Sequence, residues 1–255
     1  TLQHVFINNK QKCRVNLLLA IGFVPFLLTA CSTSQTQPFI KAVNFSSIQV
    51  NIPTDAGTNQ GALAMRVGVD AIAVGDAKAA NNAFNAALSS DMNNPGLHVA
   101  NALAYQVRAR AGEPALFNLA ETGYLVALEQ QHDFQSAALQ LTHLYFEHKR
   151  YTKAQQTAAY ALKLDSTSIE ALYLLASSSY HIGDAELALW AIEQAYSLDP
   201  NNRLVARLVP IIYASAGLTD EATYFINEKQ HILKPLTSDK LQQRVVQWKR
   251  AYELV

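Results

Sequence analysis

The chain of 255 residues has little of several residue types, and each shortage excludes a class of protein. Its two cysteines are too few for a small domain held together by disulfides. Lysine and arginine number 20, as do aspartate and glutamate, so no basic excess favours a nucleic-acid binder. Charged residues make up only 16 %, while half of the residues are hydrophobic, which excludes a disordered chain. Only ten glycines and eight prolines interrupt an alanine-rich sequence, and this composition favours an all-helical protein.

The first thirty residues have the pattern of an export signal. Three cations between residues 10 and 14 precede a mostly apolar run, 15–28. This run is shorter than the roughly 20 residues that a membrane-spanning helix needs, so it predicts a secretory signal peptide. It ends in Leu28-Thr29-Ala30-Cys31, which resembles the lipobox of bacterial lipoproteins. The alternative is an ordinary signal followed by a chance cysteine.

The lipobox resemblance implies that residues 1–30 are cleaved and that Cys31 carries a diacylglycerol group. Ser32, in place of an aspartate, implies an anchor in the outer membrane, with the protein facing the periplasm. Residues 31–60 are rich in Ser, Thr, Gln and Asn and contain helix breakers. No apolar period of 3.6 residues begins before about Ala62, so we expect a lipidated cysteine followed by a flexible linker.

Residues 169–202 resemble one tetratricopeptide repeat (TPR), a pair of antiparallel helices. Ala176, Ala188 and Ala195 occupy the positions where small side chains let the helices approach closely. Gly183 lies at the turn between the helices, where a positive φ ends the first helix. Pro200 lies after the second helix, which it cannot continue because it lacks an N–H group.

The same register recurs on both sides of this unit. The second copy fits only if about six residues are inserted near Gly112. In the last copy Pro210 and Lys229 replace small residues, and we expect its first helix to be kinked or to start late. The sequence thus predicts an all-α TPR helical-hairpin solenoid over residues 61–234, with repeats at 61–94, 95–134, 135–168, 169–202 and 203–234.

Residues 235–255 predict one further helix. Leu241, Val245, Trp248 and Tyr252 are spaced by four, three and four residues, which forms one apolar stripe, and Ser238 is a candidate N-cap. A solenoid leaves an apolar face uncovered at its end, and a helix of this kind covers it. We therefore expect a capping helix. The alternative is that it begins another module.

The sequence contains no motif of catalytic chemistry. It lacks a glycine-rich phosphate loop, a nucleophile elbow and a pair of cysteines that could hold zinc after processing. His143, Glu147 and His148 form the one cluster that could contribute to a metal site, but their order matches neither zinc-protease motif. We therefore expect no catalytic residue, metal or cofactor. The alternative is a metal-dependent periplasmic hydrolase that uses this cluster.

The TPR resemblance implies which side chains line a concave groove, namely those at positions two, five, nine, twelve and thirteen of each first helix. They form an apolar and aromatic surface with few cations, which favours an extended or helical polypeptide partner over a carboxylate clamp. The alternative is that the aromatic side chains pack between repeats. The expected groove residues are Leu139, His143, Phe146, Glu147, Tyr173, Ser177, Tyr180, His181, Arg207 and Ile211, with Val99, Leu103 and Gln106 in the second copy.

The layout of lipid anchor, linker and repeats resembles the TPR lipoproteins that help to build pili and secretion pores, notably the Tad pilus lipoprotein and the pilotins. This resemblance implies a non-enzymatic periplasmic scaffold that binds protein partners and no nucleic acid. An adaptor for cell-wall enzymes or for outer-membrane barrel assembly is the alternative.

Overall fold

The computed structural model describes residues 60–233 and 235–253. The predicted signal peptide, the lipidation site at Cys31 and the linker up to residue 59 lie outside these ranges. Within them, no helix combines the length and the apolar character that crossing a bilayer requires.

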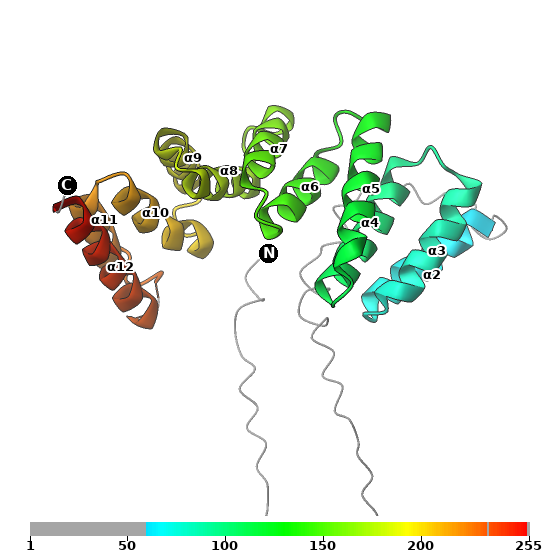
Figure 1. The fold of residues 1–255 in the computed structure, drawn as a ribbon, viewed down its shortest axis with the longest axis horizontal. Helices are drawn as coiled ribbons and strands as arrows, with labels where there is room; N and C mark the ends of the chain where they lie inside the picture. Colours follow the sequence, from blue (N-terminus) through cyan, green and yellow to red (C-terminus); the bar gives the residue numbers. More distant parts are fainter. Residues whose placement is uncertain (1–59, 234, 254–255) are drawn as a thin grey trace, which may run out of the picture.

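Regular structure in the described ranges is helical, and the helices follow one another along an arch (Figure 1). Each helix packs against the next one in the chain, which is the serial packing of a helical-hairpin solenoid. We call the first helix of each pair an A helix and the second a B helix. The A helices are α2 (Gln60–Ala73), α4 (Pro95–Arg110), α6 (Gln135–Glu147), α8 (Ile169–Ile182) and α10 (Arg203–Ser215); the B helices are α3 (Ala77–Ser90), α5 (Phe117–Gln130), α7 (Tyr151–Leu164), α9 (Ala185–Leu198) and α11 (Thr219–Glu228).

Small side chains lie where the helices come closest, as the sequence predicts. Ala176, Ala188 and Ala195 are almost fully buried. In the first hairpin a Cβ on Gly68 would lie 2.5 Å from the ring of Phe84. Such a distance is far below van der Waals contact, so α2 and α3 can pack this closely only because residue 68 has no side chain.

The turns between helices use the residues that the repeat pattern predicts. Gly183 ends α8 with φ of 81°, in the left-handed region that glycine adopts readily. The next residue, Asp184, caps α9 by accepting a hydrogen bond from the backbone N–H of Leu187 at 3.2 Å. Asp76 and Asn202 cap α3 and α10 in the same way.

The second and fifth helix pairs depart from the regular repeat, and the prediction made for the fifth pair is partly wrong. In the second pair the extra residues extend α4 to Arg110 and form a short 3-10 helix, η3 (Pro114–Leu116). In the fifth pair the expectation of a late start is wrong, because Asn202 caps α10 and the helix begins at Arg203. Pro210 is buried inside this helix, which loses one backbone donor there but continues to Ser215.

The last helix, α12 (Pro235–Glu253), packs against α10 and α11. Leu241 and Val245 are buried, and Trp248 packs against the same core, as the apolar stripe predicts. The N-cap prediction is wrong, because α12 starts at Pro235 and Ser238 is buried inside it, with no hydrogen-bond partner for its Oγ in the described part of the chain. Proline suits the first turn of a helix, where an N–H group would have no intrahelical acceptor. That α12 is the end of the array stays a prediction.

The hydrophobic core is divided along the arch. One cluster joins α2, α3 and α4 around Phe84, and a second joins α4 to α7 around Tyr124. The largest runs from α7 to α12 and includes Leu172, Ile192 and Ile212. The core is therefore a series of local units, each held by its neighbours.

Candidate functional site

The A helices α6, α8 and α10 carry most of the predicted binding residues. They contact one another in sequence, and Figure 1 shows them on the inner side of the arch relative to α7, α9 and α11. We define the A-helix surface as the predicted residues of these helices that are at least partly exposed. They are Leu139, His143, Phe146, Glu147, Tyr173, Tyr180, His181, Arg207 and Ile211.

An aromatic cluster lies in the middle of this surface, where α6, α7 and α8 meet. The rings of Tyr151 and His181 stack with centroids 4.2 Å apart and planes 9° from parallel. Phe146 meets these two rings at 5.5 and 5.7 Å, and Tyr180 lies 5.3 Å from His181. Burial, and then the nearby charge of Arg244, lower the pKa of His181, and both effects favour the neutral imidazole. Sequence reasoning missed Tyr151 because it begins a B helix.

His143 lies beside this cluster and connects α6 to α8. Its Nε2 is 2.5 Å from Oε1 of Glu170, in the first turn of α8. The hydrogen bond from His143 lowers the pKa of the Glu170 carboxyl, which outweighs the opposing effect of burial. This pair links two neighbouring A helices at the surface.

Glu147, at the end of α6, belongs to a polar network with α4 and α5. Arg110 holds both of its carboxylate oxygens, one of them at 2.7 Å from Nε, and Gln106 donates to it at 3.1 Å. The Tyr124 hydroxyl donates to Oε1 of Gln106 at 2.7 Å. Burial lowers the pKa of Arg110 to about 10, which leaves it a cation at neutral pH. The Glu147 carboxylate is thus engaged by Arg110 and Gln106, although the residue remains exposed.

Four side chains expected in the groove are buried instead. Val99, Leu103 and Gln106 of α4 are at most 1 % exposed. The first two belong to the core cluster around Tyr124, and Gln106 is held by its hydrogen bonds with Tyr124 and Glu147. Ser177 of α8 is 4 % exposed. Its short side chain lies between the larger Tyr173 and Tyr180, one helical turn to either side, and does not reach past them. These four residues do not form part of the accessible surface.

The candidate metal cluster is not assembled. Glu147 binds Arg110, His143 binds Glu170, and His148 packs on the ring of Phe117 with centroids 4.0 Å apart. Burial and nearby arginines also lower the pKa of His148. Among residues 60–233 and 235–253, no three His, Cys, Asp or Glu side chains are placed to hold one metal ion.

Helix α12 adds a cation that the repeat positions do not predict. The Arg244 guanidinium lies 3.4 Å from the hydroxyl of Tyr180. The exposed Arg207 and the half-buried Ile211 lie on α10, which separates α8 from α12 in the series. The end of the A-helix surface near α12 therefore combines aromatic, aliphatic and cationic groups.

Solved structures with a similar fold support this architecture. No family model matches the chain. A crystal structure of a MamA protein is 20 % identical, with a TM-score of 0.60, over 69 % of this chain and 96 % of that one. MamA from Desulfovibrio magneticus RS-1 is 15 % identical, with a TM-score of 0.62, over 68 % of this chain and 95 % of that one. YrrB, described as a TPR protein with an unusual peptide-binding site, is 14 % identical, with a TM-score of 0.60, over 71 % of this chain and 90 % of that one. At these identities the likeness shows the fold alone, and that fold is the TPR helical-hairpin solenoid.

Proposed function

We propose that the protein is a non-enzymatic scaffold that binds a polypeptide partner on its A-helix surface. The observation that carries this proposal is the aromatic and aliphatic surface of α6, α8 and α10. Phe146, Tyr173, Tyr180 and Ile211 remain partly exposed there, although each also packs on the core below. Half-buried aromatic side chains held in place by a core lose little entropy when a partner covers them, and they dominate the energy of many interfaces.

The polar groups of this surface would orient such a partner. Arg207 is exposed at one end, and the His143–Glu170 pair offers both a ring and a carboxylate near the other. An extended or helical segment bound across three parallel A helices would place successive side chains against successive helices. The peptide-binding site named for YrrB, which has a similar fold, is in keeping with this mode.

We further propose that the scaffold works in the bacterial cell envelope. The lipobox at Cys31 and the polar linker support a lipid anchor in the outer membrane, with the array in the periplasm. The order of anchor, linker and repeats supports a part in pilus or secretion-system assembly. Mass spectrometry of the mature amino terminus tests the anchor: a diacylated Cys31 is expected, and an unmodified chain that continues through residue 31 would contradict it.

Site-directed photo-crosslinking tests the binding surface. A photoreactive amino acid at position 173, 180 or 211 is expected to capture the same partner in the producing cells. The matched control is position 190, where Trp190 is exposed on the B helix α9. Capture from position 190 as strong as from the A-helix positions, or different partners at each position, would contradict the proposal.

Substitution gives an independent measurement with the partner so identified. The Tyr173→Ala/Tyr180→Ala variant should bind it at least tenfold more weakly, because truncation of two interface tyrosines removes most of the anchoring area. Trp190→Ala should bind as the unmodified protein does. Equal affinities for both variants would place the binding site elsewhere.

A further inference from the structure

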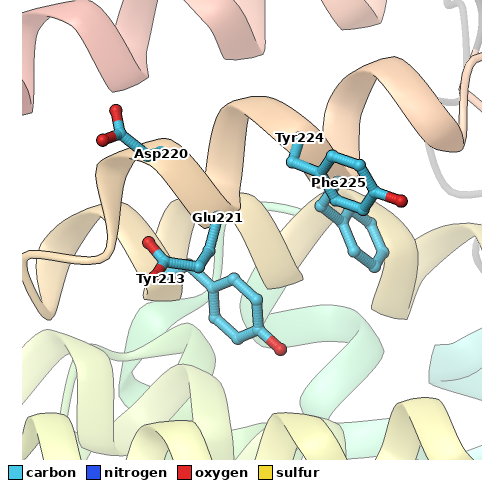
Figure 2. Close-up of a pocket in the computed structure, with 5 residues that line it drawn as sticks. All are labelled: Tyr213, Asp220, Glu221, Tyr224 and Phe225. Carbon is cyan, nitrogen blue, oxygen red and sulfur yellow. The ribbon is translucent and has the colours of Figure 1, made fainter.

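A surface pocket lies away from the A-helix surface, where α10 meets α11. It is open to solvent, has a volume of about 510 Å³ and is lined by Tyr213, Asp220, Glu221, Tyr224 and Phe225. Figure 2 shows the rings of Tyr224 and Phe225 on one side and the Tyr213 ring with Glu221 on the other. The pocket thus joins three aromatic rings with two carboxylates.

The aromatic walls are fixed by packing. Phe225 is almost buried and meets the ring of Tyr196 in α9 edge to face, with centroids 5.2 Å apart. It meets Tyr213 in a similar arrangement at 6.4 Å. Tyr224, by contrast, is 68 % exposed. The exposed ring of Tyr224, next to the packed rings of Phe225 and Tyr213, offers a face on which a planar cation can stack.

The charge around the pocket is mainly negative. Glu221 forms no ion pair with any residue of the described ranges, and Glu193 of α9 accepts a hydrogen bond from the Tyr213 hydroxyl at 3.4 Å. Burial first, and then the Glu193 and Glu221 carboxylates, raise the pKa of Tyr213. Of the nearby cations, Lys249 pairs with Asp220 at 2.9 Å. Lys229 lies over the Tyr196 ring, 5.7 Å from its centroid. Glu221 therefore remains available to an added cation.

We propose that this pocket binds an arginine side chain of a peptide partner. A guanidinium group is planar, stacks on aromatic faces and donates two parallel hydrogen bonds to one carboxylate. Tyr224 provides the exposed ring, and Glu221 provides a carboxylate without an ion-pair partner among the described residues, while Tyr213 and Phe225 contact the aliphatic part of the side chain. Its lining shares no residue with the A-helix surface, and it goes beyond the proposed function because it specifies a basic ligand at the junction of α10 and α11.

Titration of the full chain with N-acetyl-arginine methylamide tests the proposal, with the ring signals of Tyr213, Tyr224 and Phe225 followed by NMR. Saturable shifts at these three residues are expected. The analogue N-acetyl-norleucine methylamide, which keeps the aliphatic stem without the charge, should bind at least fivefold more weakly. Equal binding of the two compounds, or no saturable shift with the arginine compound, would overturn the proposal.

Matched variants separate a specific site from general attraction. Glu221→Gln and Tyr224→Leu should each weaken arginine binding at least threefold. Glu228→Gln removes the same charge from an exposed position of the same helix, outside the pocket lining, and should leave binding unchanged. A loss with Glu228→Gln as large as with Glu221→Gln would mean that only net charge matters and would refute the site. Tyr180→Ala should not affect this binding, so the result is independent of the A-helix surface.

Discussion

The guanidinium of Arg244 in α12 donates a hydrogen bond to the hydroxyl of Tyr180 in α8, which connects residues 64 positions apart in the sequence. The contact is exposed and, at 3.4 Å, long, so its contribution to stability is small. The charge of Arg244 has a second effect, because it lowers the pKa of His181, which is next to Tyr180 in the sequence. The last helix thereby influences the chemistry of the A-helix surface.

Substitution of Arg244 by Gln should raise the pKa of His181. Burial is the larger cause of the present shift, so the pKa in the variant should remain below its ordinary value. An NMR titration of the imidazole signal measures the change. Lys240→Gln removes one charge a turn earlier on α12 and should have a smaller effect. An equal rise in both variants would show that the net charge of α12, and not the proximity of Arg244, lowers the pKa of His181.

Substitution of Glu147 by Gln should destabilise the protein by about 1–3 kcal/mol, because Arg110 would keep a partly buried charge without its carboxylate partner. Urea unfolding followed by circular dichroism measures the loss. Glu113 provides a control, since it pairs with Arg108 from a more exposed position. Glu113→Gln should cost less, and the reverse order would contradict the structural role given to the Glu147 network.

The His143–Glu170 pair should make stability depend on pH. The pKa of Glu170 is lowered in the folded protein, so its contribution is present above the unfolded-state value of about 4.3 and is lost as the pH falls through the folded-state pKa. At pH 7 Glu170→Gln should therefore lower the melting temperature more than Glu186→Gln, which alters the first turn of α9. This difference should shrink below pH 4. A difference that stays constant over the whole range would contradict the assignment.

Substitution of Gly68 by Ala should destabilise the first hairpin by about 1–3 kcal/mol, because the new Cβ would overlap the Phe84 ring at 2.5 Å. Thermal unfolding followed by circular dichroism measures the change. Phe84→Leu in the same chain should recover part of this loss, since a smaller side chain makes room for the new methyl group. Additive losses in the double variant would show that the two residues do not collide.

The sequence predicts the fold well because helix packing in this architecture repeats the same local requirement. Within one hairpin, Ala176 and Ala188 allow the helices to pack closely, and Gly183 allows the turn between them. The start of α12 was harder to predict, since both Pro235 and Ser238 are plausible first residues. The packing of the helix on α10 and α11 places Ser238 inside it.

The candidate site is predicted less completely, because accessibility depends on contacts between repeats. The register places Gln106 and Ser177 on the inner face, but the Arg110–Glu147 network and the tyrosines flanking Ser177 leave both residues buried. Arg244 reaches Tyr180 from outside the repeat pattern. The pocket at Tyr213 and Glu221 requires α9, α10 and α11 together.

The division of the core has a mechanical consequence. A pull on the amino-terminal end of the array would load the cluster around Phe84 first, and that cluster has no residue in common with the next one. We expect the first hairpins to unfold before those of the largest cluster, on which the rings of Tyr173 and Tyr180 pack. The array would then lengthen under force at its amino-terminal hairpins while the binding residues of α8 keep their positions.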